Sequence, residues 1–401
     1  MKRLLLFTGI IILFATEILR VYFIMPFPGS QHRNTIDLAY FIHRNRLFLR
    51  LLGLLLVIVP LYRSLVKGKT WSRILLTMVM VLYAVVFYFF NFRFEADKMF
   101  YQPGTIRFAD AATNTIPLNK LVIGVTINDA SKAYPVQVIG YHHQVRDTVG
   151  NTPVMITYCT VCRTGRVFSP LVNGRSETFR LVGMDHFNAM FEDATTKSWW
   201  QQATGVSIAG PLKSQRLAEI PSSQSSLSDW IAQHPDTKIL QPDTVYKKQY
   251  EDLADYDKGT IKGSLEKRDS GSWKMKSWVV GIATKDHTKA YDWNDLIRHQ
   301  LIQDTVGDTP VLLLPGTDST TFYVWNRNLK GQVLQFERLP GSATIKDGNT
   351  GSTWTLNGKC TAGTLKDQQL QAVQSYQEFW HSWSNFHPGT TRYRDPNALE
   401  K

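Results

Sequence analysis

Residues 122–154 read VIGVTINDASKAYPVQVIGYHHQVRDTVGNTPV, and residues 279–311 read VVGIATKDHTKAYDWNDLIRHQLIQDTVGDTPV. The two stretches match at a constant offset of 157 residues, with Lys-Ala-Tyr and Asp-Thr-Val-Gly at corresponding positions. Ordered matches continue further along the chain, such as Trp230 with Trp383. This similarity predicts an internally duplicated region in which two modules pack about a pseudo-twofold axis, each covering the open face of the other.

Each module is predicted to consist of short strands separated by turns. Residues 122–127, 153–158, 166–172 and 177–183 are rich in β-branched or aromatic residues and are bounded by Gly, Asn, Asp or Pro. Asn173-Gly174 predicts a hairpin turn between two of these strands. Two stretches that end in His-Pro predict helices, at residues 226–234 and 376–387. The expected fold class is therefore α+β and mostly β.

Three apolar stretches precede this region, at Leu4–Ile24, Leu47–Val66 and Ile74–Phe92. Each is about long enough to cross a hydrocarbon core of ~30 Å as a helix. Twelve basic and two acidic residues lie before residue 95, so +10 of the net charge of +12 falls on membrane flanks. The remainder of the chain is nearly neutral, which argues against a DNA- or RNA-binding domain.

The predicted organisation is a membrane region with three transmembrane helices at residues 1–94, a first module at 95–240, a connector at 241–276 and a second module at 277–401. Basic residues before the first span and between the second and third spans fall on one side of the membrane, which the positive-inside rule makes cytoplasmic. A cleaved signal peptide is the alternative for the first segment. Both interpretations place the chain after Phe92 outside the cytoplasm.

The sharpest local motif is TYCTVCR, which carries Cys159 and Cys162 at the end of a predicted strand. Two thiolates at this spacing can chelate one soft metal ion, and they can also form a reversible disulfide. Arg163 stands where c-type haem attachment would need a histidine, and no second C-x-x-C completes a four-cysteine zinc site. The second module has Gly316 and Ser319 at the matching positions, so the site is expected in the first module.

Histidines near the same strands are the expected further ligands. His142 precedes the strand that leads to Cys159, and His186 follows another predicted strand. Two cysteines, a histidine and a nearby methionine would suit copper, whereas two cysteines and two histidines would suit zinc. The other candidates for the pocket are Met184, Asn188, Arg163, Trp200 and Cys360.

Each of these residues also has a structural interpretation. His142 recurs as His299 in the module without thiols, so a structural hydrogen bond fits it as well. Trp200 is more typical of core or rim packing than of a binding platform. Cys360 is either a small buried hydrophobe or a residue that approaches the C-x-x-C across the module interface. The C-x-x-C itself is open to three interpretations: a metal site, a thiol redox pair and a structural pair.

At these residues the chain resembles a known family. TYCxxCRTGRVF, then HFNAMFEDATT, then SWWxQATG with AGPL are similar to the bacterial family called domain of unknown function 3179, from about Ile116 to about Arg394. YHHQVRDTVG and TYCTVCRTGRVF resemble its variant with an N-terminal membrane region. The resemblance implies a bacterial envelope protein and no particular reaction. It points to Cys159 and Cys162, with His142 where the family tends to place a histidine.

The sequence therefore predicts a multi-pass protein of the bacterial inner membrane whose C-terminal region lies outside the cytoplasm. The leading hypothesis is transition-metal binding through the C-x-x-C, with copper or zinc as the metal. A thiol-disulfide oxidoreductase and a non-enzymatic scaffold of an envelope complex are the alternatives, so enzyme activity stays open. The expected partners are the lipid bilayer and other envelope proteins, and no nucleic acid is expected.

Overall fold

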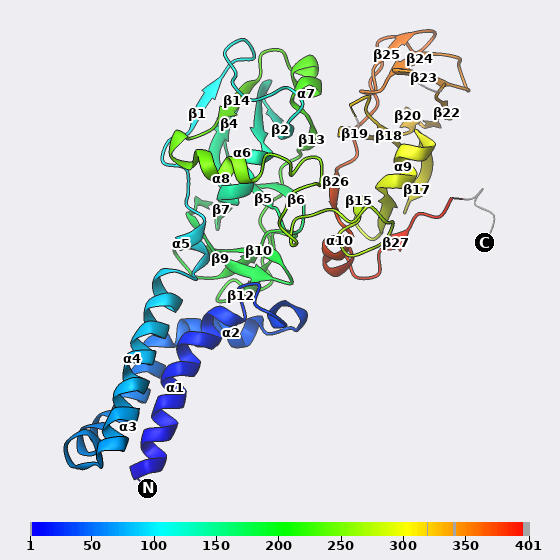
Figure 1. Ribbon diagram of the computed structural model, residues 1–401. Helices are drawn as coiled ribbons and strands as arrows, with labels where there is room; N and C mark the ends of the chain where they lie inside the picture. Colours follow the sequence, from blue (N-terminus) through cyan, green and yellow to red (C-terminus); the bar gives the residue numbers. More distant parts are fainter. Residues whose placement is uncertain (1, 319, 340–341, 396–401) are drawn as a thin grey trace. The chain divides into compact units, whose positions relative to one another are not determined.

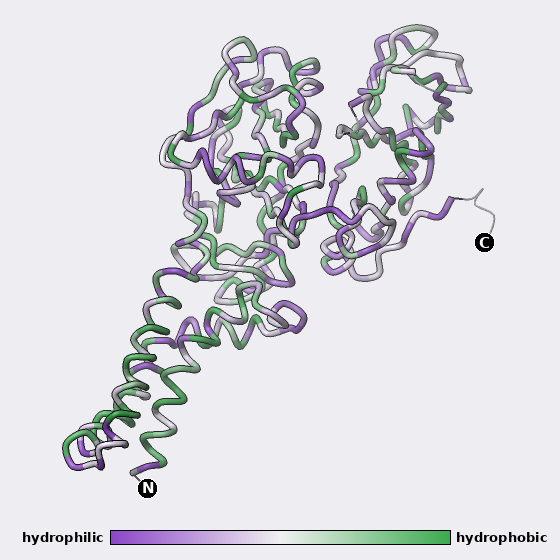
Figure 2. The backbone as a smooth tube through the Cα atoms, viewed as in Figure 1, coloured by the Kyte–Doolittle hydropathy of each residue, from purple (hydrophilic) through white to green (hydrophobic). Residues whose placement is uncertain are grey.

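Three long helices form the N-terminal part of the chain, where the apolar stretches predict them (Figure 1). α1 covers Lys2–Tyr22, α3 covers Arg46–Lys67 and α4 covers Thr70–Phe92. Each is long and apolar enough to cross a membrane, and hydrophobic residues dominate all three (Figure 2). Large apolar side chains such as Leu55 are exposed on them, which suits contact with lipid tails rather than with water.

The computed structural model describes residues 2–318, 320–339 and 342–395, with about 32% strand and 30% helix. The chain divides into two compact units, and both are discontinuous in sequence. Unit 1 contains residues 1–101 and 177–216, and unit 2 contains residues 102–176 and 217–401. The N-terminal helices therefore share a unit with a segment from the middle of the region that the sequence assigns to the first module.

In unit 1, a four-stranded antiparallel sheet packs with the N-terminal helices. The sheet has the order β12-β11-β10-β9 and comprises β9 (Phe179–Asp185), β10 (Asn188–Asp193), β11 (Trp199–Gln201) and β12 (Ser207–Ala209). The short helices η1 (Ser30–His32), α2 (Ile36–Arg44) and α5 (Ala96–Met99) complete the unit. Trp199 meets the Tyr40 ring edge-on at 5.0 Å, and the Met184 amide donates to the Ile24 carbonyl at 2.7 Å.

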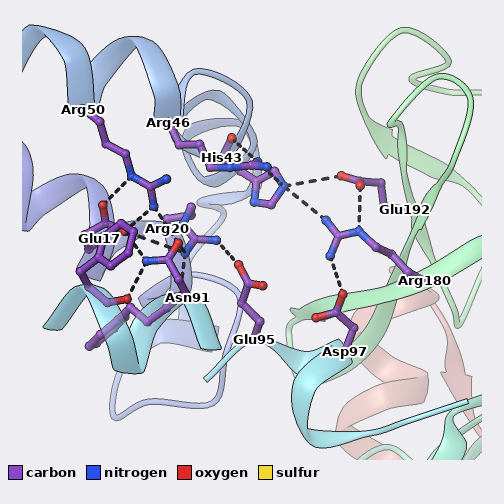
Figure 3. Close-up of polar contacts among 12 residues, drawn as sticks. Glu17, Arg20, His43, Arg46, Arg50, Asn91, Glu95, Asp97, Arg180 and Glu192 are labelled. Carbon is purple, nitrogen blue, oxygen red and sulfur yellow. Dashed lines mark hydrogen bonds and ion pairs between the residues drawn. The ribbon is translucent and has the colours of Figure 1, made fainter. Parts of the chain in front are cut away.

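A network of buried charges joins the three long helices near one of their ends (Figure 3). The Glu17 carboxylate accepts two hydrogen bonds from Arg50 at 2.7 Å and one from the Asn91 amide at 2.8 Å. Arg20 pairs with Glu95 and donates to the Phe90 carbonyl at 2.7 Å. Glu17 and Arg20 are 0% and 1% exposed. Charges inside apolar helices are costly unless they are paired, so this network fixes how the helices pack.

In unit 2, the two matching stretches of sequence fold with the same order of elements. The first gives β2 (Leu121–Ile127), β3 (Ala130–Pro135), α6 (Val136–His142), β4 (Gln144–Val149), β5 (Thr152–Cys159) and β6 (Thr164–Phe168). The second gives β15 (Trp278–Ala283), β16 (Thr288–Asp292), α9 (Trp293–His299), β17 (Ile302–Val306), β18 (Thr309–Pro315) and β19 (Phe322–Asn326).

These elements build several small sheets. β1 (Arg107–Ala109), β14 (Lys238–Gln241) and β13 (Ser223–Ser226) join β3 and β2 in the order β1-β14-β3-β2-β13. β26 (Ser375–Phe379) and β27 (Thr391–Arg392) flank β15 and β16 in the order β26-β15-β16-β27. Two three-stranded sheets have the orders β4-β5-β6 and β17-β18-β19.

Within its described residues, unit 2 also contains one sheet of short strands, two hairpins and four further short helices. Four short strands form the sheet β22-β23-β24-β25, at Phe336–Glu337, Thr344–Asp347, Thr353–Thr355 and Cys360–Ala362. Two hairpins are β7–β8 (Leu171–Val172, Arg175–Ser176) and β20–β21 (Asn328–Leu329, Gln332–Val333). The helices are α7 (Leu227–Gln233), η2 (Thr244–Tyr246), α8 (Lys247–Asp252) and α10 (Trp380–Phe386).

Several contacts recur at matched positions of the two halves. Gly124 and Gly281 each lie against a tryptophan ring, of Trp230 and Trp383 respectively, where a Cβ would come within 2.2 Å of a ring carbon. Each indole N–H donates to a threonine hydroxyl at 2.8 Å. Likewise, a tyrosine hydroxyl donates to an aspartate in both halves, in the pairs Tyr134–Asp147 and Tyr291–Asp304. These contacts support the interpretation of a duplication, and the pseudo-twofold axis stays a prediction.

Most local predictions agree with the structure, and one helix is shorter than predicted. Asn173-Gly174 forms the turn between β7 and β8, with both residues at positive φ, and Ser226 caps α7. The predicted helix at 376–387 begins only at Trp380. The residues before it form β26, which pairs with β15 over Ser375–Phe379, so sheet hydrogen bonds override the local pattern there.

Candidate functional site

The C-x-x-C forms the turn between β5 and β6. Cys159 is the last residue of β5 and pairs with Thr164 across the hairpin. The turn is tight, because the Cys162 amide donates to the Cys159 carbonyl at 3.3 Å and Arg163 takes a left-handed φ of 55°. The sulfur atoms of Cys159 and Cys162 consequently lie 4.0 Å apart, and both residues are completely buried. All three cysteines of the chain carry thiols.

Residues from the second half of unit 2 hold this turn in place. The Phe379 amide in β26 donates to the Cys162 carbonyl at 3.0 Å. Arg163 donates from Nε to the Gln377 side chain at 2.8 Å, and its guanidinium lies 3.9 Å from the centre of the Trp278 ring. The thiol pair comes from the first half of the duplicated region, but its surroundings come from the second half.

His381, in the first turn of α10, is the imidazole at the thiol pair. Its Nε2 lies 3.8 Å from the Cys162 sulfur, and its Nδ1 lies 3.0 Å from the Met275 carbonyl oxygen. A carbonyl can only accept, so Nδ1 carries the proton and the Nε2 lone pair faces the thiol. Burial and the charge of Lys276 lower the pKa of His381 to about 3, which keeps the ring neutral near pH 7.

The Cys162 thiol is protonated near pH 7. Burial, together with the hydrogen bond and charge of Cys159, raises the pKa of Cys162 well above its ordinary value, while Lys276 and Ser382 act weakly against this shift. The Lys276 ammonium donates to the Val161 carbonyl at 2.6 Å, and burial lowers the pKa of this lysine. Cys162 and Cys159 raise the pKa of Lys276, against the effect of burial. The charge of Lys276 is therefore close enough to interact with both sulfurs.

A series of polar contacts between β6, β26 and α10 holds the surroundings of the site together. The Ser382 hydroxyl lies 3.0 Å from that of Thr164 and donates to the Glu378 carboxylate at 2.9 Å. Glu378 in turn forms a buried ion pair with Arg166 at 2.5 Å. Because a buried charge without its partner is strongly destabilising, this pair ties β6 to β26 firmly.

His142, which the sequence suggests as a ligand, lies at the end of α6 and is completely buried. Its Nε2 is 2.7 Å from the Tyr250 hydroxyl, and its ring also contacts those of Tyr141 and Tyr246. This environment agrees with the alternative of a structural hydrogen bond. A ligand role for His142 stays a prediction.

Four further candidates belong to unit 1. His186 binds the Asp185 carboxylate through Nδ1 at 2.7 Å, and this hydrogen bond raises the pKa of His186. Asn188 pairs with Gln202, and the Trp200 indole donates to Asp193 at 2.9 Å, as buried structural contacts do. Met184 is a buried residue of β9. Their predicted part in a metal site is therefore still only a prediction.

Cys360 packs in an apolar core in the second half of unit 2. Its neighbours in that cluster include Trp354 and Leu312, and it is completely buried. Its sulfur lies 3.5 Å from the Ala362 carbonyl oxygen. The structure thus agrees with the first alternative for this residue, a small buried hydrophobe.

Sequence reasoning missed His381 and Lys276. The matched tryptophans Trp230 and Trp383 place His381 opposite Ser228, so the second half has a histidine where the first half has none. This difference mirrors the difference at the cysteines and was the available signal. Within the part of the chain that the structure describes, no group of three or more His, Cys, Asp or Glu side chains is arranged to hold a metal ion.

The comparisons with known proteins identify one family. Residues 102–390 match the family described as "Protein of unknown function (DUF3179)", which covers well over half of the chain and includes the thiol pair and His381. No curated protein and no solved structure matches the chain. The family description assigns no reaction, so a function has to be argued from the site.

Proposed function

The chain belongs to the DUF3179 family, and on that premise we propose that it is a membrane-anchored protein of the bacterial envelope that binds Cu(I) between Cys159 and Cys162. The observation that carries this proposal is the pair of buried sulfurs, 4.0 Å apart across one tight turn. An ion with metal–sulfur bonds of about 2.3 Å can bridge sulfurs up to ~4.6 Å apart, so the turn needs little adjustment.

The surroundings favour Cu(I) over zinc. Structural zinc sites almost always have four ligands, and the described residues offer no group of even three in position. Soft thiolates select Cu(I), which accepts lower coordination numbers than zinc does. Two thiolates and one Cu(I) leave a single negative charge, and the half-buried Lys276 ammonium is placed to compensate it. The neutral Nε2 of His381 lies 3.8 Å from the Cys162 sulfur, beside the two-sulfur site, and does not complete a group of three ligands among the described residues in this arrangement.

Binding requires that both thiols lose their protons. The pKa of Cys162 is raised in the metal-free protein, so the ion has to displace protons that are held tightly. Affinity for Cu(I) should consequently rise with pH between pH 6 and 8. The half-exposed His381 lies beside Cys162 and marks the side from which an ion can enter.

A competition titration tests the proposal. The full chain is purified in detergent under anaerobic, reducing conditions and titrated with Cu(I) against a chromogenic Cu(I) chelator. We expect one bound equivalent, and we expect the Cys159→Ser/Cys162→Ser variant to lose it. Cys360→Ser is the matched control, because it removes a buried thiol outside the site and should bind like the parent. Equal binding by the parent and the double variant would exclude the proposal.

We further propose that the chain after Phe92 lies outside the cytoplasm, in agreement with the distribution of basic residues. Fusions of a periplasm-active and a cytoplasm-active reporter to residue 395 test this orientation. Activity of the cytoplasmic reporter alone would reverse the assignment.

A thiol-disulfide oxidoreductase is the weaker candidate. Such an enzyme needs an exposed thiol with a depressed pKa, whereas Cys162 is buried and its pKa is raised. Rapid alkylation of Cys162 at pH 7 would favour this alternative. A non-enzymatic scaffold predicts that both cysteines can be replaced without loss of function in the cell.

A further inference from the structure

Unit 1 contains a second polar site, separate from the thiol pair. A cavity of about 450 Å³ is lined by α2, the start of α3, α5 and the sheet strands β9 and β10. Its cationic side chains are Arg44, Arg46, Arg180 and Lys197, and its anionic ones are Glu95, Asp97 and Glu192. Figure 3 shows most of these side chains where they approach one another.

Each anion of the cavity has an arginine as its partner. Arg180 pairs with Glu192 at 2.9 Å and with Asp97 at 3.3 Å, and Glu95 pairs with Arg20. Within the described residues, no carboxylate forms an ion pair with Arg44, Arg46 or Lys197. We call these three cations the basic triad. With Arg20 included, five cationic and three anionic side chains of the residues that the structure describes meet here, so the cavity has a surplus of two positive charges and favours an anionic ligand.

A buried imidazole orients two of the cavity's arginines. Arg46 and Arg180 approach Nε2 of His43 at 3.2 and 3.3 Å, and arginine can only donate. Nε2 is consequently an acceptor and Nδ1 carries the proton. This Nδ1–H is buried and has no partner among the described residues, while the His43 side chain is only 9% exposed. The Nε2 side of the ring therefore faces the cavity and holds the two guanidinium groups at its wall.

The cavity lies where the long helices begin and end. α1 ends at Tyr22, α3 begins at Arg46 and α4 ends at Phe92, so all three termini belong to the same end of the helical region. Leu47 lines the cavity and is 66% exposed, and Phe48 and Leu51 continue an exposed apolar surface along α3. An occupant with a phosphate in the cavity could therefore lay a hydrocarbon chain along this surface.

We propose that this cavity binds the phosphate headgroup of an anionic membrane lipid, held by the basic triad, with its acyl chains along Leu47 and Leu51. The arrangement gives the phosphate three cations outside the existing ion pairs, and it keeps the tails in contact with apolar side chains. A free phosphate shares the headgroup chemistry, but it makes no use of the apolar surface. This inference does not depend on copper binding.

The test uses the full chain in a neutral detergent, where no charged bilayer surface contributes to binding. Delipidated protein is titrated with short-chain phosphatidylglycerol, and bound lipid is counted by native mass spectrometry. We expect saturation at one lipid per chain. Loss of a cation near a lipid phosphate weakens binding by about fivefold, so Arg44→Gln/Arg46→Gln/Lys197→Gln should bind about a hundredfold more weakly.

Arg93→Gln is the matched control, since Arg93 is exposed at the same end of α4 but does not line the cavity. It should bind the lipid like the parent. Competition with millimolar inorganic phosphate distinguishes a lipid from a free phosphate as the ligand. A site that binds the lipid through both headgroup and tails should retain it, whereas a site that binds only the phosphate group should release it. Equal loss in the triple variant and in Arg93→Gln, or equal affinity for phosphatidylcholine, would overturn the proposal.

Discussion

At the scale of single residues, two glycines set the packing of the two halves of unit 2. Gly124 in β2 and Gly281 in β15 each leave room for a tryptophan ring that lies directly against the backbone. A methyl group there would come within 2.2 Å of a ring carbon of Trp230 or Trp383. Neither ring can move easily, because its indole N–H is bound to a threonine.

We therefore expect Gly124→Ala and Gly281→Ala to destabilise the protein, each by about 1–3 kcal/mol, as overpacking of a core does. Thermal unfolding of the purified full chain, followed by tryptophan fluorescence, measures the effect. Gly348→Ala is the control, since a Cβ there would come no closer than 3.9 Å to any atom. Unchanged melting in all three variants would show that the rings yield freely.

His381 predicts a dependence of stability on pH. Its pKa is about 3 in the folded protein and near 6.5 in an unfolded chain, so the folded state binds fewer protons between these values. The stability that its neutral form contributes is present above pH 6.5 and is lost as the pH falls toward 3. The loss should amount to at most about 1.4 kcal/mol per pH unit.

The comparison of His381→Gln with the parent, at pH 7 and pH 5, checks this expectation. The parent should lose more stability on acidification than the variant does. His287→Gln, which replaces an exposed histidine, should behave like the parent. If His381→Gln shows the same loss as the parent, the imidazole is not protected in the way that the structure indicates.

The sequence revealed the two cysteines of the candidate site but not their surroundings. Cys159 and Cys162 are close in sequence, so their spacing alone predicts that their sulfurs meet. His381 follows Cys162 by more than two hundred residues, and its contact depends on β26 pairing with β15. Conversely, His142 is near Cys159 in sequence but is directed to Tyr250. The ligand role of His142 stays a prediction, whereas the contact between His381 and Cys162 depends on strand pairing that the sequence does not reveal.

At the scale of elements, the charged network decides how the three long helices associate. Helices in lipid gain little from burying apolar side chains against one another, so paired polar groups and close packing hold them together. Gly9 of α1 and Gly53 of α3 contribute the close packing, because a Cβ on either would come within 2.9 Å of the facing helix. Hydropathy predicted the three spans but not which polar side chains would meet between them.

We expect Glu17→Gln to destabilise the helices by about 1.5–3 kcal/mol, because it removes the charged acceptor of Arg50, whose side chain is 19% exposed. The double variant Glu17→Gln/Arg50→Gln removes both charges and should recover part of the loss. Unfolding in mixed micelles with increasing SDS measures both. A double variant that is no more stable than Glu17→Gln would argue that the charge pair is not the reason for the loss.

The short elements were harder to predict than the long ones. Residues 376–379 carry a pattern that fits a helix, and they become a strand because β15 offers them hydrogen bonds. The β-branched run of β2 and the Asn-Gly turn between β7 and β8 need no distant partner and were predicted correctly. The local sequence therefore predicted the turns and the core strands, whereas pairing between distant strands decided where the short elements begin and end.

At the scale of the whole molecule, the division of the chain into units was not predictable from the repeat. The match between the halves suggested one continuous first module. In the structure, residues 177–216, which lie within the predicted first module, share a compact unit with the N-terminal helices, and the predicted domain boundaries stay a prediction. Trp199, which is completely buried, contacts Tyr40 and His43 in α2, and Gly183 lies against the Ile24 backbone. Such contacts between distant segments leave no local signal in the sequence.

This division predicts the behaviour of truncated proteins. A fragment of residues 102–401 removes the helices that cover β9–β12, and it should aggregate because Trp199 becomes exposed. A fragment that also replaces residues 177–216 by a short Gly-Ser linker should stay soluble and monomeric. Size-exclusion chromatography of the two fragments distinguishes these outcomes. A soluble 102–401 fragment would mean that the sheet of unit 1 is stable without its helices.

The discontinuity of unit 1 also has a consequence for biosynthesis. The helices leave the ribosome before the sheet of their unit, and they wait for it until residue 216 has been synthesised. At 5–20 residues per second, that delay is on the order of ten seconds. During it, α2 and α5 lack their covering strands, while the chain that follows is already free to begin its own folding. Nascent chains stalled before residue 216 should therefore be the most sensitive to protease and the most dependent on chaperones.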